Sequence, residues 1–383
     1  MINLRAVALI LFTLLASGCS WFEDDEDIDA YEPAELTEIN EQFEANVIWS
    51  RDVGDGVGEF YNKLQPVVYD NKVIVADSEG LVRAFDAITG DEIWETEVQS
   101  EIYGGVAAGS NLVAIGTTNA EVIVLDAKTG EEKWRNLVSS EVIASPVITD
   151  GKVVARTIDG KVFAMNASTG ERDWLYDRTV PALTLRGTSS LSASRGAVVT
   201  GFANGKIVLF IVENGKAVWE KRVASPSGRS ELDRVVDVDA TPLIIGDTVY
   251  AVTFNGNIAA FNMRSGDALW QREFSSVQNI SVEGQLISVV GARSKVSALD
   301  RRTGGTLWSQ EVLRDRKLTA AVSFGKFFVA GDYDGYLHWF DKTTGNLVAR
   351  NSFGSGIVSD PVATGTHLYI YSRSGTLYAL EAP

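Results

Sequence analysis

Side chains that could do acid–base, metal or thiol chemistry are few in this chain of 383 residues. It contains two histidines, His338 and His367, and a single cysteine, Cys19. The stretch Asp332-Tyr-Asp334-Gly335 begins like a calcium-binding loop, but it lacks the third ligand and the distal glutamate of such a loop. The sequence has neither the G-x-S-x-G elbow of a serine nucleophile nor a phosphate-binding P-loop. It therefore predicts no catalytic residue, no metal site and no cofactor, and it places Asp332 in a hairpin turn.

Cys19 follows an apolar stretch near the N-terminus. Arg5 supplies a positive charge, and the apolar run from Ala6 to Ala16 is too short to span a bilayer. The ending Leu-Ala-Ser-Gly-Cys19 resembles a bacterial lipobox, where a signal peptide is removed and the cysteine is acylated. The resemblance implies a signal peptide over residues 1–18 and a lipid anchor, including palmitate, on Cys19. Because Ser20 is not aspartate, it also implies the periplasmic face of the outer membrane in a Gram-negative bacterium.

The segment after Cys19 is strongly acidic. Residues 20–45 contain eleven Asp or Glu and neither Lys nor Arg, and the whole chain has a net charge of −17. Since like charges repel each other, we expect residues 19–45 to form an extended, solvated tether. The negative charge also argues against nucleic acid as a partner.

Beyond the tether, one sequence motif, which we call the blade phrase, recurs with a period of about forty residues, in the range typical of propellers and solenoids. Its first copy runs from Gly80 to Trp94 and reads GLVRAFDAITGDEIW. The alternating apolar residues predict half-buried strands, and Asp-x-x-Thr-Gly predicts a tight turn. Another hairpin signal lies upstream of each copy. Each period therefore holds four short antiparallel strands, which is the content of one propeller blade.

Counting the copies predicts an all-β fold, an eight-bladed β-propeller over residues 46–383. The last copy stops after its third strand, whereas Val47-Ile48-Trp49 is a lone outer strand at the opposite end. Pairing these two would close the ring and leave no open sheet edge. Outer strands end in a residue that we expect to pack between neighbouring blades. At eight positions this residue is Trp49, Trp94, Trp134, Trp174, Trp219, Trp270, Trp308 or Ala349.

The blade phrase resembles the repeat of the pyrroloquinoline-quinone dehydrogenases, which are also eight-bladed. Those enzymes hold their quinone with a vicinal disulfide, a calcium ion and a catalytic Asp. A chain with one cysteine cannot form a disulfide within the monomer. A cofactor-dependent dehydrogenase is therefore a disfavoured alternative.

Two insertions interrupt the repeat. The distance from one phrase-ending tryptophan to the next phrase is 26 residues after Trp94, but 31 after Trp174 and 37 after Trp219. Both insertions connect an outer strand to the next inner strand, so we expect them on one face, above adjacent blades. Their candidate interaction residues, apolar and charged, are Leu183, Leu185, Arg186, Asp237 and Asp239. A second interpretation is that the leucines pack on the ring while Arg186 pairs with Asp237 or Asp239.

The lipobox, the acidic tether and eight cofactor-free blades resemble the propeller lipoproteins of the outer-membrane β-barrel assembly machinery, the Bam complex. In that family a Leu-x-Leu-Arg segment and an Asp-x-Asp segment bind a POTRA domain of BamA. The resemblance implies that Leu183, Leu185, Arg186, Asp237 and Asp239 bind BamA, and that the chain is a scaffold assisting insertion of outer-membrane proteins. Strand edges could also bind nascent outer-membrane proteins. The alternative is a periplasmic propeller that binds a sugar or another small ligand at the ring centre.

Overall fold

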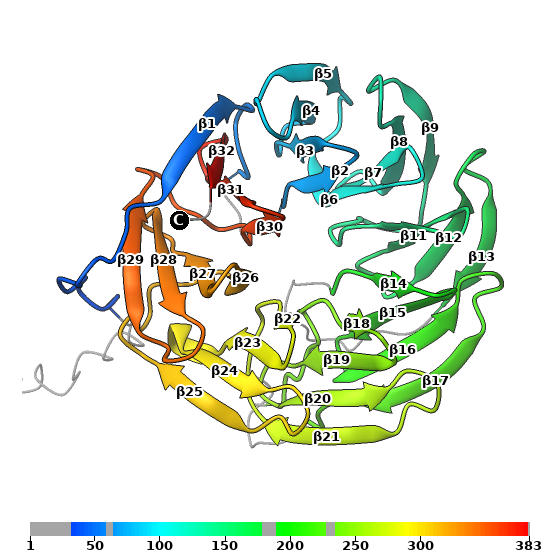
Figure 1. Cartoon of the computed structure of the whole chain (residues 1–383). Helices are drawn as coiled ribbons and strands as arrows, with labels where there is room; N and C mark the ends of the chain where they lie inside the picture. The colour runs from blue at the N-terminus through cyan, green and yellow to red at the C-terminus, as the bar shows by residue number, and fades with distance from the viewer. Residues whose placement is uncertain (1–31, 59–63, 178–188, 227–233, 382–383) are drawn as a thin grey trace, which may run out of the picture.

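The strands form a closed ring of eight blades (Figure 1). A computed structural model describes residues 32–58, 64–177, 189–226 and 234–381. Each blade is a four-stranded antiparallel sheet, which confirms the predicted eight-bladed, all-β propeller. In the described ranges the one helical element is a single 3-10 turn, η1 (Ala292–Ser294).

The strands of each blade are named A to D from the centre of the ring outward. Blades 1 and 2 contain β2 (Val67–Tyr69), β3 (Lys72–Ala76), β4 (Leu81–Asp86), β5 (Glu92–Glu97), β6 (Ile102–Gly109), β7 (Leu112–Thr117), β8 (Glu121–Asp126) and β9 (Glu132–Leu137). Blades 3 and 4 contain β10 (Val147–Thr149), β11 (Lys152–Arg156), β12 (Val162–Asn166), β13 (Arg172–Tyr176), β14 (Ser192–Ser194), β15 (Ala197–Phe202), β16 (Lys206–Ile211) and β17 (Ala217–Arg222). Blades 5 and 6 contain β18 (Leu243–Ile245), β19 (Thr248–Val252), β20 (Asn257–Asn262), β21 (Ala268–Glu273), β22 (Ser281–Glu283), β23 (Leu286–Val290), β24 (Val296–Asp300) and β25 (Thr306–Gln310). Blades 7 and 8 contain β26 (Val322–Phe324), β27 (Phe327–Gly331), β28 (Tyr336–Asp341), β29 (Leu347–Ser352), β30 (Val362–Thr364), β31 (His367–Tyr371), β32 (Thr376–Glu381) and β1 (Asn46–Asp52).

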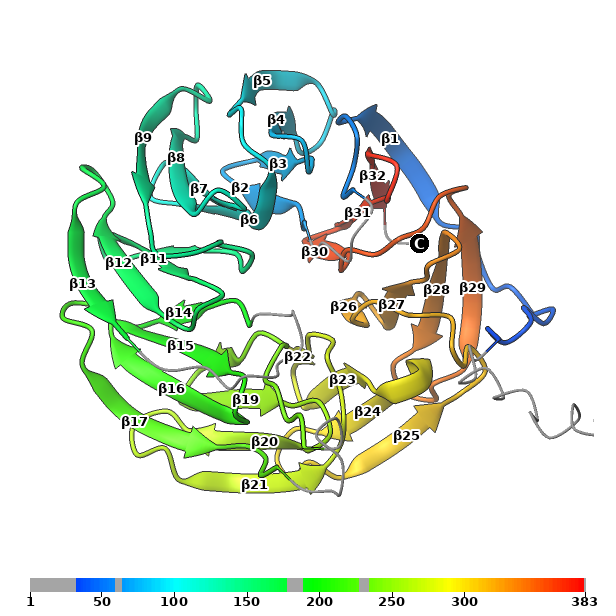
Figure 2. The same ribbon diagram turned by 180° about the vertical axis from the view of Figure 1, so that it is seen from behind.

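The two ends of the described chain meet in blade 8. Strand β1 pairs with β32 in antiparallel register, from Asn46 opposite Glu381 to Asp52 opposite Thr376. Figure 2 shows the blue β1 on the outside of the red strands, so the N-terminal strand completes the last blade. The predicted closure of the ring by an N-terminal strand is confirmed.

The antiparallel strands give the ring two distinct faces. Connections from strand D of one blade to strand A of the next lie on the same face as the B–C turns, and we call this the D–A face. The A–B and C–D turns lie on the opposite face, the C–D face. Backbone hydrogen bonds join neighbouring blades across the D–A face, as from Ile102 N to Ser78 O at 3.1 Å and from Val142 N to Thr117 O at 3.0 Å.

Seven outer strands have an indole that lies against the following blade, in the middle of the strand and not at its end as the sequence predicted. The Nε1 groups donate hydrogen bonds of 2.8–3.3 Å to the backbone carbonyls of Ala87, Ala127, Ala167, Val212, Met263, Arg301 and Lys342. The ring of Trp49 lies so close to Gly90 that a Cβ there would approach it to 2.6 Å, and Gly90 has a φ of +71°. Glycine meets both requirements because it has no side chain and tolerates positive φ.

Blade 7 lacks this tryptophan. Its outer-strand position is Ala349, which pairs with Trp339 on the neighbouring strand β28. Blade 8 has no C–D turn for an indole to cover, because its outer strand β1 comes from the other end of the chain. The fully buried Trp339 instead packs edge-on against Phe43, with ring centroids 5.3 Å apart.

The hydrophobic core lies between the blades and follows the ring. Each cluster of buried side chains combines neighbouring blades, for example Val199 of blade 4 with Val249 of blade 5. Strands B and C contribute most of it, since their residues are buried on both sides. Stability is therefore distributed over eight similar interfaces.

Residues 32–45 lie along the ring, outside blade 7 (Figure 1). Leu36 and Phe43 pack against the buried clusters of blades 6 to 8, and Ala45 is itself buried. We expected the acidic residues 19–45 to form a solvated tether; the described part of this segment instead contacts the propeller. Its acidic side chains point to solvent while its apolar ones face the ring. We call residues 34–45 the strap.

Candidate functional site

Both insertions are D–A connections of adjacent blades. The first joins β13 to β14, and the second joins β17 to β18. Their described ends lie on the D–A face, as the spacing of the repeats predicts. Leu183, Leu185 and Arg186 fall outside the described residues, so the candidate site is built here from the bases of both insertions and from Asp237 and Asp239.

The Asp237-Val-Asp239 segment is set into the ring between the B–C turns of blades 4 and 5. Val238 N donates to Phe202 O at 3.4 Å, and Phe254 N donates to Asp237 O at 2.9 Å. A Cβ on Gly201 would lie 2.2 Å from Val238, so the close approach of the segment requires glycine there. Asp237 is 1 % exposed, whereas Asp239 is half-buried. Asp239 is thus the more accessible of the two carboxylates.

Ser189 links the bases of the two insertions. Its hydroxyl donates to Ala240 O at 3.1 Å and accepts from Gly201 N at 3.1 Å. Ser189 follows the first insertion and Ala240 ends the second, so one fully buried side chain joins them. The two loops therefore share one base on the D–A face, and a shift of either base would disturb the other.

Arg156, at the end of β11, is a buried cation that sequence reasoning missed. Its guanidinium donates to Ser189 O at 3.3 Å and lies 5.0 Å from the ring centroid of Phe202. Burial lowers the pKa of Arg156 to about 10, and the charges of Asp239 and Asp237 partly offset this effect. Arg156 stays protonated at neutral pH and supplies the positive charge behind the Asp-x-Asp segment. The available sequence signal was a charged residue that ends a strand directly after three apolar residues.

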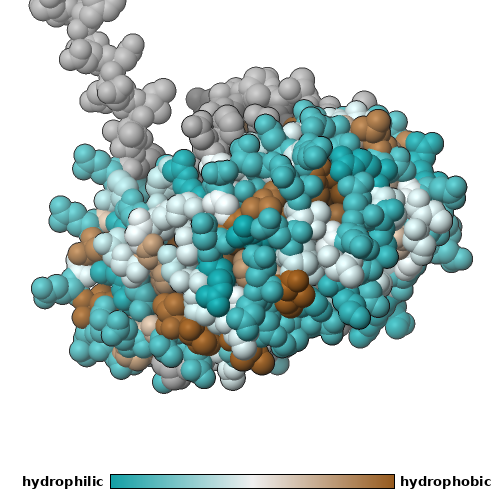
Figure 3. Space-filling model, turned by 90° about the horizontal axis from the view of Figure 1, so that it is seen from above, coloured by the Kyte–Doolittle hydropathy of each residue, from teal (hydrophilic) through white to brown (hydrophobic). Residues whose placement is uncertain are grey.

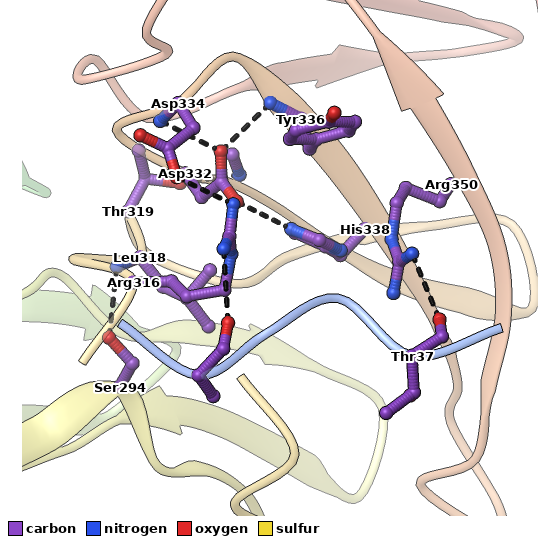
Figure 4. A network of polar contacts seen from close by, with 12 residues as sticks. Thr37, Ser294, Arg316, Leu318, Thr319, Asp332, Asp334, Tyr336, His338 and Arg350 are labelled. Carbon is purple, nitrogen blue, oxygen red and sulfur yellow. Dashed lines mark hydrogen bonds and ion pairs between the residues drawn. The ribbon is translucent and has the colours of Figure 1, made fainter. Parts of the chain in front are cut away.

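A second buried polar cluster lies in blade 7 (Figure 4). Arg316 binds Asp332 at 2.7 Å through Nε and Asp334 at 2.8 Å through Nη2, and His338 Nε2 lies 2.9 Å from Asp332 Oδ2. The other oxygen of Asp332 accepts from the backbone N–H groups of Asp334 and Tyr336 at 3.0 and 2.8 Å. These contacts make the calcium-like sequence a B–C hairpin turn, with its carboxylates engaged by an arginine.

The titration behaviour of this cluster follows from burial and charge. Burial opposes ionisation of Asp332, but hydrogen bonds from His338, the Tyr336 backbone and Arg316 outweigh it and lower the pKa of Asp332. Burial lowers the pKa of His338 more than Asp332 raises it, with Arg350 and Arg316 adding to the decrease. Among the described residues, His338 Nδ1 has no hydrogen-bond partner. A neutral His338 that donates through Nε2 fits these surroundings.

The acidic residues that recur at the C–D turns accept hydrogen bonds from the backbone of those turns. Asp86, for example, accepts from the backbone N–H groups of Ile88 and Thr89, both at 2.9 Å, and these bonds lower its pKa. Within the described ranges, no group of three or more His, Cys, Asp or Glu side chains could hold a metal ion. The same ranges contain no helix long and apolar enough to cross a bilayer.

A hollow at the start of the second insertion is lined mainly by polar residues of that connection and of blade 5. Ser225, Asn255, Asn257 and Glu273 contribute to it, and no aromatic side chain is among its lining residues. Small-ligand sites are usually lined by hydrophobic and aromatic side chains with a few polar groups. This hollow therefore gives little support to the alternative of a small-ligand receptor.

Comparisons with known proteins agree with this architecture. The family model described as "Outer membrane protein assembly factor BamB" matches residues 34–101, 78–310 and 292–383. A protein of that name from Kangiella koreensis is 46 % identical over 380 residues, covering 99 % of this chain and 96 % of the relative.

Solved structures give the same result. The structure of BamB from Moraxella catarrhalis has a TM-score of 0.82 at 26 % identity, covering 88 % of this chain and 100 % of that one. A europium-containing methanol dehydrogenase reaches a TM-score of 0.74 at 14 % identity, with 88 % and 93 % covered, which shows a shared fold alone. The chain belongs to the family of the outer membrane protein assembly factor BamB.

Proposed function

We propose that this chain is a lipid-anchored scaffold of the outer-membrane β-barrel assembly machinery. In this proposal residues 1–18 are a signal peptide, Cys19 carries the lipid, residues 19–45 link it to the ring, and residues 46–383 form the propeller. The ring faces the periplasm, binds a POTRA domain of BamA and assists the insertion of outer-membrane proteins. It acts by binding and carries no cofactor.

The observation that carries the proposal is the shared base of the two insertions. Ser189 and Arg156 hold the first insertion against the segment that contains Asp237 and Asp239. Leu183, Leu185 and Arg186 belong by sequence to that first insertion, whose described base at Ser189 lies beside the Asp-x-Asp segment. A pre-organised surface of apolar and charged groups loses little conformational entropy when a partner binds. We propose that Asp239, which is partly exposed, contacts the partner, and that the buried Asp237 positions the segment.

Affinity purification from solubilised membranes tests the function. We expect BamA to be recovered with the tagged chain. Failure to recover BamA, together with recovery of a sugar or other small molecule on the purified ring, would favour the small-ligand receptor instead.

The substitution Arg186→Glu tests the site. We expect it to abolish BamA co-purification with a near-normal melting temperature, because like charges placed across an interface cost several kcal/mol. The matched control is Arg264→Glu, at an exposed C–D turn of blade 5 on the opposite face. Wild-type binding by the Arg186→Glu variant would remove Arg186 from the site. Lost binding with a large fall in melting temperature would make its role structural.

A further inference from the structure

The strap crosses blade 7 from one face of the ring to the other. Ala34 N donates to Arg314 O at 2.9 Å, in the D–A connection between blades 6 and 7, and Gln42 N donates to Val348 O at 2.9 Å, near the start of β29. Thr37 lies between them, where its carbonyl accepts from Arg350 at 3.2 Å. The strap therefore runs antiparallel to β29, from the D–A face toward the C–D face, and then turns back into β1.

The side chains of two arginines of the ring, Arg316 and Arg350, bind backbone carbonyls of the strap near the D–A face (Figure 4). Arg316 Nη1 donates to Ala34 O at 3.1 Å while its other nitrogens bind Asp332 and Asp334. Because Arg316 is almost fully buried and braced by two carboxylates, it can move little. Ala34 thus receives a hydrogen bond from Arg316 and gives one to Arg314, which fixes the chain at the D–A face.

Near the C–D face, apolar contacts hold the strap. Phe43 lies 4.8 Å from Phe327 and 5.3 Å from Trp339, measured between ring centroids. The strap also covers the residue before the outer-strand position of blade 7, Val348, which is 2 % exposed. On other blades the equivalent residue is 38–56 % exposed, as for Ile48, Ile93, Val218, Leu269 and Leu307. Figure 3 shows brown apolar patches among hydrophilic side chains on the side of the ring that it views.

We propose that the strap sets the point at which the membrane tether leaves the ring, so that the lipid anchor holds the D–A face nearer the membrane than the C–D face. This inference rests on the proposed lipidation of Cys19. A tether without a docked strap would start at Asn46, on the C–D face. The docked strap moves its origin to Ala34, on the face that carries both insertions.

The strap also shortens the tether. Fully extended chain spans at most about 3.6 Å per residue, so the 15 residues from Cys19 to Ala34 reach at most about 54 Å. Without the docked strap, the 27 residues from Cys19 to Asn46 would reach about 97 Å. A shorter tether on the D–A face brings the candidate partner-binding surface close to the bilayer and limits how far the ring can turn.

Hydrogen exchange tests whether the strap is docked, independently of the membrane. In the Cys19→Ala protein, the amides of Ala34 and Gln42 should exchange slowly. They should exchange fast in a release variant, Leu36→Ser with Phe43→Ser, whose changes lie outside the ring. Gln42→Pro is a second release variant, since proline has no N–H to donate to Val348. Leu137→Ser, on the exposed side of β9, is the control. Fast exchange of both amides in the parent protein would overturn the inference.

Energy transfer to a lipid-borne acceptor tests the orientation. Cys19 is the only native cysteine. In the lipidated protein its sulfur carries the lipid, so one introduced cysteine takes the dye. Ser374→Cys labels the D–A face and Thr366→Cys the C–D face, at the two ends of β31. On vesicles of phosphatidylethanolamine and phosphatidylglycerol, we expect higher transfer from the Ser374→Cys protein, and equal transfer once the strap is released.

The outcomes separate this inference from the proposed function. A protein that sediments with vesicles but gives equal transfer from both dyes, or higher transfer from the Thr366→Cys protein, overturns the inference alone. A full-length protein that stays in the supernatant overturns the lipid anchor and the inference with it.

Discussion

At the scale of single residues, His338 makes the ring sensitive to acid. Its pKa is below the ordinary value of about 6.5 because the side chain is buried beside Arg316 and Arg350. Below pH 6.5 the unfolded chain binds a proton that the folded chain does not, so stability is full above this pH and falls below it. We expect the melting temperature to drop between pH 7 and pH 5, and to drop less in His338→Gln. The control is His367→Gln, in a hairpin of blade 8. Equal drops in wild type and His338→Gln would contradict this account.

Arg156 is the residue on which the two insertions depend together. Replacing it with leucine removes the hydrogen bond to Ser189 O and the charge that faces Asp237 and Asp239. Loss of one buried charged group from such a set costs about 3–5 kcal/mol. We expect Arg156→Leu to lower both stability and BamA binding, and Asp239→Asn in the same chain to recover part of the stability. A double-mutant cycle of chemical denaturation checks this: strictly additive effects would show that the two side chains are not coupled.

At the scale of elements, β1 closes the ring although it lies far from blade 8 in sequence. Deleting residues 46–50 removes five of the seven residues of this strand, including Trp49 and its contact with blade 1. Burial of a large aromatic side chain alone contributes about 3–5 kcal/mol, so we expect a markedly lower melting temperature. A deletion of five residues in the acidic tether, 23–27, which leaves both the strap and β1 intact, is the control. An unchanged melt after the first deletion would contradict the role of β1 in closure.

Elements that repeat could be predicted from the sequence, and elements that occur once could not. The period and the truncated last copy predicted eight blades, the strand that closes them and the face of the insertions. The strap could not be predicted, because its acidic side chains dominate its composition while the contacting residues Leu36 and Phe43 form no repeat. The same applies to Arg156 and to Trp339, each a single departure from the blade pattern. Only the folded ring shows which neighbours these residues have.

At the scale of the whole molecule, we expect Cys19 to determine membrane attachment without contributing to the folding of the propeller. Cys19 precedes the strap and the ring, so Cys19→Ala should leave the propeller intact and remove it from the membrane. An acylated cysteine gains about 0.8 kcal/mol for each buried methylene, and an alanine gains none of this. Membrane fractionation in cells lacking BamA, with circular dichroism of the released protein, checks both parts. A variant that still sediments with membranes in those cells would count against lipidation.

Because the ribosome makes the chain from its N-terminus, the two strands that close the ring are synthesised at different times. Strand β1 is synthesised before its partner β32, which lies 335 positions later in the chain when Asn46 is paired with Glu381. Before that pairing, β1 can already contact blade 1. Trp49 Nε1 donates to Ala87 O and Arg51 Nε donates to Gly90 O at 2.6 Å, and both acceptors belong to blade 1. Non-local pairs of this kind form late, because a very long loop must close first. Until β32 pairs with β1, the blades form an open arc with an unpaired strand on each side of the gap, so this one pairing completes the ring.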